Sequence, residues 1–350
     1  MSTMKSPGVF SAAAPRSLAQ GAEPPLEERA REGREELGGG LDVPSPQAAP
    51  GSALGPWVWI DGVSVERAEA RVSVFDRGFL YGDSVFETLR TYDGRAFALA
   101  EHLERLARSA RLVHIDLPVP LDQLRQEVEA ALASVVERPS LGECYVRLML
   151  SRGSGALGLD PGTAVQPLRV MIVAPLTPPP PVAYTQGIGV ITFATQRVGD
   201  ATPAAGAKVG NYLVAVLAMR QAREHDAAEA LIVDSAGQVV EGASSNLFVV
   251  RGGTLLTPSE REGILPGITR RTLLEVAREL GVEVRFETVA REDLRLCEEV
   301  FVSSSIREIL PVVRIDGAPV GAGTPGPLTL RLLEAFRKRV RAPRAGQAPG

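Results

Sequence analysis

The chain has 350 residues, 45% of them hydrophobic and 23% charged, and its formal net charge is −4. This composition is ordinary for a globular protein, and the length predicts one large domain or two of moderate size. Without a dense block of Lys and Arg, the sequence favours neither a nucleic-acid nor a membrane partner. No apolar run approaches the roughly 20 residues that cross a bilayer, and no secretory signal is evident. We therefore expect a cytoplasmic protein.

Metal and serine chemistry find little support in the residue patterns. Cys144 and Cys297 lie far apart in the sequence, so they form neither a disulfide framework nor a zinc spacing. The three histidines show no metal-binding pairing, and no G-x-S-x-G elbow of a serine hydrolase is present. We predict no metal site.

The composition also suggests domain boundaries. Residues 1–55 are rich in Ala, Pro, Gly, Glu and Arg, which predicts a disordered N-terminal extension, and residues 341–350 form a shorter C-terminal tail. Four consecutive prolines in 176–187 predict a stiff, extended interdomain linker. The linker would separate a small domain at 56–175 from a larger domain at 188–340.

Within these limits, hairpins and helices are interspersed. Asp61-Gly62 and Asp93-Gly94 predict two hairpins, and apolar residues at helical spacing predict a helix over 100–113. Strands are predicted at 144–151, 168–176, 188–195 and 298–304, hairpins at 229–242 and 246–258, and helices at 211–225 and 268–281. Because strands and helices do not alternate regularly, the pattern indicates an α+β fold rather than a doubly wound one.

One glycine-rich segment matches a nucleotide-binding pattern only formally. Gly153, Gly155 and Gly158 have the spacing of the dinucleotide fingerprint, and they follow a predicted strand. The fingerprint also requires a helix that begins at the last glycine, and here Leu-Asp-Pro-Gly follows instead. We interpret the segment as a loop.

Three other segments carry groups that suit a phosphorylated, ring-bearing cofactor. Lys208 lies among small and apolar residues, which disfavour its charged form as amine chemistry requires. Glu241 ends an apolar strand and therefore needs a cationic partner, either an arginine or a protonated ring nitrogen. Pro266-Gly267 opens a helix whose free amides suit a phosphate. Each feature taken alone is also common as ordinary structure.

Together these segments resemble the fold-type IV family of pyridoxal-phosphate enzymes. The resemblance covers about 57–340 and runs in order through FDRGFLYGDSVFETLR, EHLERL, AKVGNYL, VEGASSNLF, LPGITR and FVSSSIREILPV. Six ordered blocks are more specific than any single motif. The resemblance implies an α+β enzyme with a small α/β domain, a larger β-barrel-like domain with helices, and pyridoxal 5′-phosphate as cofactor.

The resemblance also assigns roles to individual residues. Lys208 would hold the cofactor and move the proton between the substrate Cα and the cofactor C4′, and Glu241 would pair with the pyridine nitrogen. Arg105 would bind the phosphate through its planar fork, and Tyr212 would hydrogen-bond the ring hydroxyl. The remaining phosphate contacts would be Ile268, Thr269, Ser304 and Ser305.

The substrate pocket resembles more than one member of the family. Tyr145 and Arg147 match the Tyr-x-Arg strand of branched-chain aminotransferases, and Tyr81 and Phe86 match their pocket positions. The same resemblance implies that the amides of Ser305 and Ile306 meet the substrate carboxylate, with help from the tyrosine hydroxyl. The spacing Lys208-x-x-Asn211 resembles D-amino-acid aminotransferases instead, and Arg152 falls where those enzymes carry a carboxylate-binding arginine. The apolar Phe86, Val85 and Ile306 favour an aliphatic side chain, at about 0.8 kcal/mol for each buried methylene.

We therefore expect transamination between a small amino acid, foremost a branched-chain one, and 2-oxoglutarate or another keto acid. The alternatives are a D-amino-acid aminotransferase, an aminodeoxychorismate lyase and a non-catalytic relative. The resemblance also implies a homodimer, in which the loop after the Tyr-x-Arg strand of one subunit borders the pocket of the other.

Overall fold

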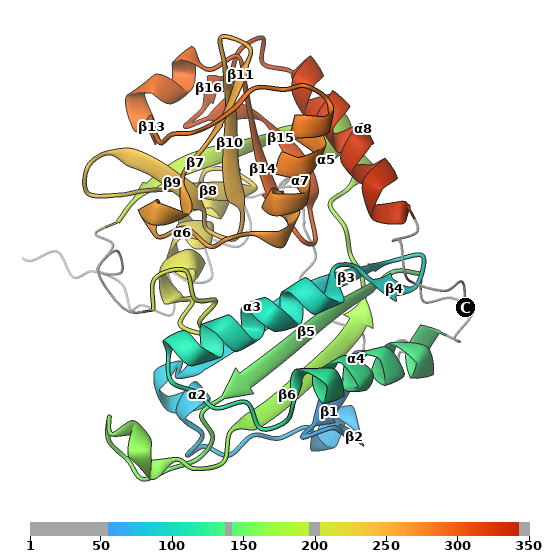
Figure 1. The fold of residues 1–350 in the computed structure, drawn as a ribbon. Helices are drawn as coiled ribbons and strands as arrows, with labels where there is room; N and C mark the ends of the chain where they lie inside the picture. Colours follow the sequence, from blue (N-terminus) through green and yellow to red (C-terminus); the bar gives the residue numbers. More distant parts are fainter. Residues whose placement is uncertain (1–54, 137–141, 196–203, 343–350) are drawn as a thin grey trace, which may run out of the picture. The chain divides into compact units, whose positions relative to one another are not determined.

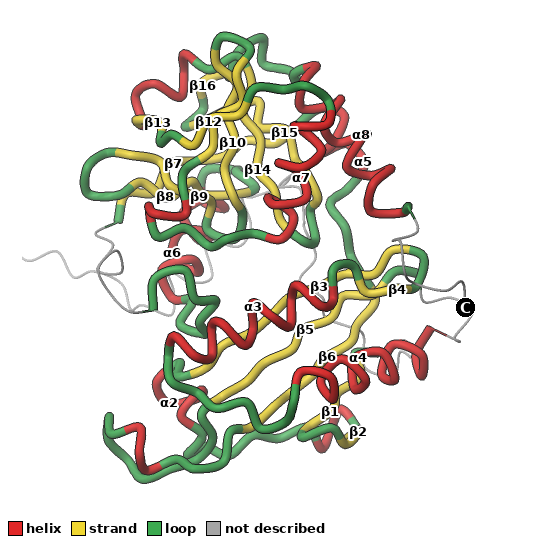
Figure 2. The backbone as a smooth tube through the Cα atoms, viewed as in Figure 1, coloured by secondary structure: helices red, strands yellow, loops and turns green. Residues whose placement is uncertain are grey.

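The computed structural model describes residues 55–136, 142–195 and 204–342 (Figure 1). The predicted N-terminal extension, apart from Gly55, and the tail from residue 343 onward lie outside these residues. Two β-sheets organise the described chain, and helices and strands are interspersed along it (Figure 2). The predicted α+β class is confirmed.

The first sheet is antiparallel throughout and has the strand order β2-β1-β6-β5-β3-β4. Its strands are β1 (Trp57–Ile60), β2 (Val63–Val65), β3 (Ser84–Tyr92), β4 (Arg95–Ala96), β5 (Cys144–Ser151) and β6 (Leu168–Pro175). Helices α3 (Leu99–Leu112) and α4 (Leu121–Val136) cover one face of the sheet (Figure 1). Leu89, Leu106 and Val146 are fully buried between that face and the helices.

Strand register separates the two faces of this sheet. In β5 the core residues Val146 and Leu148 alternate with half-buried Tyr145 and Arg147. Directly paired residues share a face, and Arg147 is paired with Thr88 of β3. Phe86, two residues from Thr88, therefore lies on the Arg147 face, whereas the flanking Val85 and Glu87 point toward α3 and α4.

The second sheet has ten strands in the order β12-β11-β10-β14-β15-β7-β8-β9-β13, with β16 paired to β15. They are β7 (Ile188–Ala194), β8 (Glu229–Val233), β9 (Gln238–Gly242), β10 (Asn246–Arg251), β11 (Thr254–Thr257), β12 (Val284–Phe286), β13 (Val289–Ala290), β14 (Glu299–Ser304), β15 (Glu308–Ile315) and β16 (Ala318–Pro319). Strands β9 and β10 are separated by four others in this order, yet only residues 243–245 join them. The sheet must therefore curl back toward itself.

Helices cover this curled sheet on its outer side (Figure 1). Helix α6 (Leu213–Glu224) packs Ala218 and Ala222 against β7 and β8. Helices α7 (Ile268–Glu279) and α8 (Pro327–Arg341) pack against β14 and each other. The short elements are α2 (Arg77–Tyr81), α5 (Pro181–Thr185) and the 3-10 helices η1 (Arg67–Glu69), η2 (Pro161–Thr163), η3 (Glu260–Glu262) and η4 (Arg291–Leu296).

The predicted hairpins, strands and three helices are confirmed, usually within one or two residues. The prediction of a wholly extended 176–187 is wrong, because Pro181 begins the short helix α5 as a favourable first helical residue. Helices α4 and α8 were not predicted. The 153–158 segment is a loop followed only by η2. Among the described residues, no helix could span a membrane and no acidic, His or Cys cluster could hold a metal.

Candidate active site

Lys208 is held at the first sheet by its backbone. Its amide donates to Ser109 Oγ of α3 (3.0 Å), and its carbonyl accepts from the amide of Phe86 in β3 (3.0 Å). The next residue, Val209, forms a β-bridge with Val85. Although the lysine lies between β7 and β8 of the second sheet in sequence, it is thus fixed against the first.

The Lys208 amine lies in an aromatic and strongly charged setting. Nζ donates to the Tyr212 hydroxyl (3.1 Å) and lies 4.6 Å from the centroid of the Phe86 ring. Burial and the nearby Arg105 charge lower the pKa of Lys208 to about 8, although Glu87 and Glu241 oppose the shift. Roughly a tenth of the amine is therefore neutral at pH 7, against less than about a thousandth for an ordinary lysine.

Glu241 and Arg105 meet at the turn before α7. Glu241 Oε2 accepts from the amide of Leu265 (3.1 Å), and Arg105 Nη1 donates to the next carbonyl, that of Pro266 (3.0 Å). The charge of Glu241 also acts on the Lys208 amine and, after burial, helps to raise the pKa of Tyr212 to about 12. The lysine, the strand-end carboxylate and the helix start therefore converge on one place.

A buried carboxylate orients Arg105. Glu87 accepts from Arg105 Nε (2.7 Å) and Nη2 (2.6 Å), and its Oε2 also lies 2.7 Å from His102 Nδ1. Burial alone would raise the pKa of Glu87, but the charge and hydrogen bonds of Arg105, with those of His102, lower it to about 2. Burial lowers the pKa of His102. The fork of Arg105 is thus fixed along one edge.

The start of α7 offers unused donors. Ile268 and Thr269 are buried, and within the described residues their amides donate to no acceptor in the chain. Such amides at a helix start bind anions. Gly267 must stay small, because a Cβ there would lie 1.9 Å from Asn246 Oδ1, while Asn246 Nδ2 holds the carbonyl of Leu265 (2.9 Å).

One serine of β14 lies beside this helix start, and two more serines follow it in the sequence. Asn246 is paired with Ser303 across β10 and β14, so the end of β14 reaches the turn that Asn246 holds. Ser303 Oγ is buried and has no hydrogen-bond partner within the described part of the chain. Ser304 and Ser305 are half-buried, and Ser304 Oγ accepts a long bond from the amide of Arg307 (3.4 Å). Hydroxyls, amides and one guanidinium make a donor set that suits a phosphate.

The predicted substrate residues divide into two groups. Phe86 packs edge-on against Tyr212 (centroids 5.1 Å apart), and Arg147 Cζ lies 3.9 Å from the centroid of the Phe86 ring. The half-buried Tyr145 shares the sheet face of Arg147. Ile306 is tied to β3 through its carbonyl, which accepts from Arg90 (3.3 Å). Phe86 and Arg147 therefore border the lysine. Val85, in contrast, is fully buried in the core of the first sheet and cannot line the pocket.

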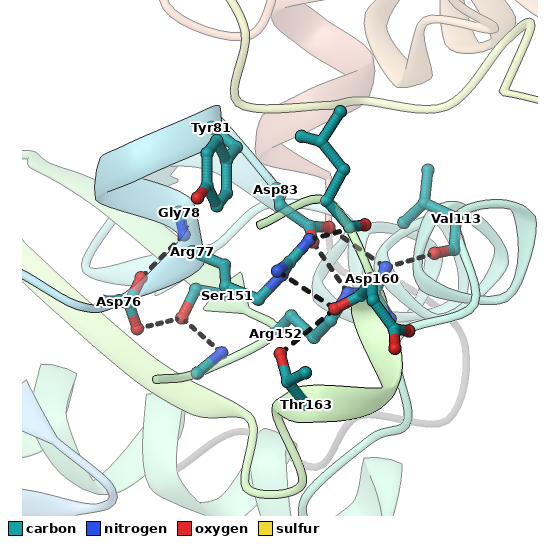
Figure 3. A network of polar contacts seen from close by, with 12 residues as sticks. Asp76, Arg77, Gly78, Tyr81, Asp83, Val113, Ser151, Arg152, Asp160 and Thr163 are labelled. Atoms are coloured by element: carbon teal, nitrogen blue, oxygen red, sulfur yellow. Dashed lines mark hydrogen bonds and ion pairs between the residues drawn. The ribbon is translucent and has the colours of Figure 1, made fainter. Parts of the chain in front are cut away.

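Tyr81 and Arg152 belong instead to a network around Asp83 (Figure 3). Asp83 accepts from Arg152 Nε (2.7 Å) and Nη2 (3.0 Å), and from Arg77 Nε (3.0 Å). Arg152 further donates to the carbonyls of Val113 and His114. The network lies next to the lysine segment, because Gly210 donates to the Ser84 carbonyl (2.8 Å).

The same network fastens the loop after β5. Arg77 donates to the carbonyls of Gly158, Leu159 and Asp160 (2.9, 3.3 and 3.2 Å), and the Tyr81 hydroxyl accepts from the amide of Gly158 (3.0 Å). The hub Asp83, like Glu87, was not singled out from the sequence. A charged residue inside the otherwise apolar run VFETL is the signal that could have indicated Glu87.

Comparisons with known proteins identify the family to which the chain belongs. The model of the family described as amino-transferase class IV matches residues 84–315. The chain belongs to this family. It is 38% identical over 280 residues to a putative branched-chain-amino-acid aminotransferase of Methanocaldococcus jannaschii, covering 80% of this chain and 95% of that one.

Solved structures give the same picture. The branched-chain amino acid aminotransferase of Escherichia coli superposes with a TM-score of 0.76 at 33% identity, covering 83% of this chain and 97% of the other. The branched-chain aminotransferase of Thermoproteus uzoniensis, solved with norvaline, has a TM-score of 0.73 at 30% identity, covering 82% of this chain and 95% of the other.

A relative with a different printed activity also matches in sequence. A D-alanine aminotransferase of Staphylococcus haemolyticus is 34% identical over 284 residues, which are 81% of this chain and 97% of the relative.

Proposed function

We propose that the chain is a pyridoxal-phosphate enzyme that moves amino groups between branched-chain amino acids and 2-oxoglutarate or another keto acid. One observation carries the proposal. An amine whose pKa is lowered to about 8 faces the same space as an anion-binding helix start and a strand-end carboxylate. When bound, the cofactor supplies an electron sink that makes the substrate Cα acidic.

The phosphate end of the cofactor fits the start of α7. Arg105 has five N–H groups, of which three are used within the described chain, so two remain for an anion. The amides of Ile268 and Thr269 supply further donors. We assign the hydroxyls of Thr269, Ser304 and Ser305 to the same group.

The ring end fits between Glu241 and Tyr212. Glu241 is held in place by the amide of Leu265, which leaves its carboxylate able to favour a protonated ring nitrogen. The Tyr212 hydroxyl, already within 3.1 Å of Lys208 Nζ, is placed to donate to the ring hydroxyl. Lys208 would hold the cofactor at rest, and its neutral Nζ would take the proton from the substrate Cα.

We assign substrate recognition to the face of β5 that carries Tyr145 and Arg147 and to the turn formed by residues 304–307, the Ser304–Arg307 turn. We assign the substrate carboxylate to the amides of Ser305 and Ile306 with the Tyr145 hydroxyl. Phe86 and Ile306 give an apolar wall for an aliphatic side chain. Arg147 has no ion-pair partner among the described residues, so it can meet the second carboxylate of a dicarboxylic substrate.

The D-amino-acid alternative receives less support from the contacts of Arg152. That alternative would use Arg152 to bind the substrate carboxylate, yet four of its five N–H groups are donated to Asp83 and to the carbonyls of Val113 and His114. We propose that Arg152 orders the loop after β5 instead. Tyr81 acts with it by binding the loop at Gly158.

We further propose that the enzyme works as a homodimer. Large apolar side chains are exposed on α2 and on the loop after β5, among them Phe79 (71%), Leu157 (71%) and Leu159 (79%). Four more lie exposed along α6 at Leu213, Val214, Val216 and Leu217. Exposed apolar surface of this kind supports burial against a second copy. Sedimentation at catalytic concentrations should give a dimer, and a fully active monomer would argue against it.

A half-reaction screen tests the substrate assignment. The holoenzyme is mixed separately with L-leucine, L-glutamate, D-alanine or aminodeoxychorismate, and the visible absorbance of bound cofactor is followed. We expect L-leucine and L-glutamate to convert the cofactor to its amine form. Conversion by D-alanine alone would favour the second candidate, and pyruvate release from aminodeoxychorismate would favour the lyase.

A further inference from the structure

A second buried charge cluster lies apart from the cofactor end of the site, around Glu308 at the start of β15. Glu308 is 3% exposed, and its backbone is left-handed, with φ of +57°. This conformation is unfavourable for a residue that is not glycine, and it persists where surrounding contacts fix it. The Glu308 carboxylate is not among the groups proposed to bind the cofactor or the substrate.

Three side chains from two elements, β3 and α8, hold this carboxylate. Tyr92 of β3 donates its hydroxyl to Oε1 (2.9 Å), and Arg90 Nη1 lies 3.5 Å from the same oxygen. Arg337 of α8 donates from Nε to Oε2 (2.7 Å). Burial, followed by the Glu308 charge, raises the pKa of Tyr92, so its hydroxyl stays a donor throughout the working pH range.

The same cluster also grips the Ser304–Arg307 turn. Arg90 Nη1 donates to the carbonyl of Ile306 (3.3 Å), and the Tyr184 hydroxyl donates to the carbonyl of Arg307 (3.2 Å). Arg337 stacks over the Tyr184 ring at 4.5 Å. Two successive carbonyls are therefore directed toward the cluster, which fixes the two peptide planes between Ile306 and Glu308, directly after the amides of Ser305 and Ile306.

We propose that Glu308 is a positioning residue that sets the Ser304–Arg307 turn so that the amides of Ser305 and Ile306 meet the substrate carboxylate. This inference rests on the proposed function. The carboxylate acts through the turn and touches neither substrate nor cofactor. Its loss should therefore weaken substrate binding more than cofactor binding. The substrate carboxylate depends on the amides of the turn, whereas Arg105 of α3 and the first amides of α7 hold the phosphate independently of the Ser304 and Ser305 hydroxyls.

Two substitutions separate the effect of the Glu308 side-chain contacts from the effect of its left-handed backbone conformation. Glu308→Gln keeps the size and an acceptor for Tyr92 but loses the charge that holds Arg90 and Arg337. Glu308→Gly adopts the left-handed backbone without strain but loses the contacts with Tyr92, Arg90 and Arg337. If the conformation alone mattered, the glycine variant would behave like the wild type. We expect both variants to bind substrate poorly, and the glycine variant more so.

The measurement is the KM for L-leucine and the inhibition constant of 4-methylvaleric acid, an unreactive carboxylic acid. We expect both to rise together by about tenfold in Glu308→Gln, the size of one charge-assisted contact. The cofactor dissociation constant and kcat should change by less than about twofold, and the melting temperature of the holoenzyme by no more than a few degrees.

Clear outcomes would overturn the inference. A wild-type KM and inhibition constant in both variants, with cofactor bound, would remove any positioning role. A rise in the cofactor dissociation constant equal to the rise in KM would make the residue merely structural. The proposed function is judged separately, because it fails only if wild-type enzyme with bound cofactor converts none of the amino donors.

Discussion

Two arginines, Arg105 and Arg152, each pair with a carboxylate through two of their nitrogens. The sequence resemblance predicted that both bind an anion, the cofactor phosphate for Arg105 and a substrate carboxylate for Arg152. Arg105 makes one further hydrogen bond, to the Pro266 carbonyl at the helix start, which leaves two of its N–H groups without an acceptor in the described chain. Arg152 makes two further hydrogen bonds, to the carbonyls of Val113 and His114 just after α3. An arginine at a matching position is therefore not enough to predict an anion-binding site. The number of N–H groups without an acceptor in the described chain distinguishes Arg105, with two, from Arg152, with one.

Arg147 extends the comparison. It lies over the Phe86 ring, on the sheet face opposite α3, and has no hydrogen bond or ion pair within the described chain. Its charge still acts on Lys208 and Tyr212. An unpaired guanidinium beside the lysine is costly unless an anion arrives, so Arg147 is expected to respond to substrate, Arg105 to cofactor and Arg152 to neither.

The largest effect should come from removing the Lys208 amine, the group proposed to hold the cofactor. Lys208→Ala should reduce turnover at least about 10⁴-fold, because the one other lysine among the described residues, Lys338, is exposed on α8 and plays no part in the proposed site. Steady-state assay of L-leucine with 2-oxoglutarate measures the loss. Lys338→Ala, which alters an exposed lysine of α8, is the control and should keep full activity.

Arg105→Lys should raise the dissociation constant of the cofactor about 10- to 100-fold, because an ammonium cannot keep both the Glu87 edge and a phosphate contact. Glu87→Gln should act in the same direction but less. Equilibrium titration of the cofactor-free protein gives both values. Arg152→Lys is the matched control, and an equal loss there would erase the difference between the two arginines.

Arg147→Met keeps the packing over Phe86 and removes the charge. We expect the KM for 2-oxoglutarate to rise about tenfold, the size of one charge-assisted contact, while the KM for L-leucine changes little. Steady-state kinetics with each substrate varied in turn separates the two. A parallel rise for both substrates would mean that Arg147 supports the pocket rather than the second carboxylate.

The smallest effect concerns pH. Because the pKa of Lys208 is lowered to about 8, its neutral, reactive fraction grows as pH rises through that value. The rate of cofactor uptake by the cofactor-free enzyme should increase about tenfold from about pH 7 to about pH 9 and then level off. Stopped-flow absorbance follows it. A rate still climbing steeply above that range would indicate an ordinary lysine.

The sequence predicted the fold well where a local pattern decides it. The strand 144–151 is β5 without adjustment, and the helix predicted from residue 100 is α3. The short helix α5 was missed because four prolines mask a legitimate helix start at Pro181. The curl of the second sheet also could not be predicted, since it depends on which distant strands pair.

The candidate site was predicted unevenly for a similar reason. Lys208, Glu241 and the start of α7 carry local signals, and the structure brings them together. The fate of Arg152 depends on Asp83 and on carbonyls far away along the chain, which no local pattern reports. Likewise Glu308 and Arg90 lie on strands distant in sequence and meet only in the folded chain.

The central claim is that Lys208 holds the cofactor, and the sequence makes it open to a direct chemical test. The chain contains only three lysines, Lys5, Lys208 and Lys338. Reduction of the holoenzyme with borohydride fixes the cofactor to its lysine, and peptide mass spectrometry then locates it. We expect the label on Lys208 alone, and a stoichiometric label on Lys5 or Lys338 with Lys208 unmodified would show that another lysine holds the cofactor.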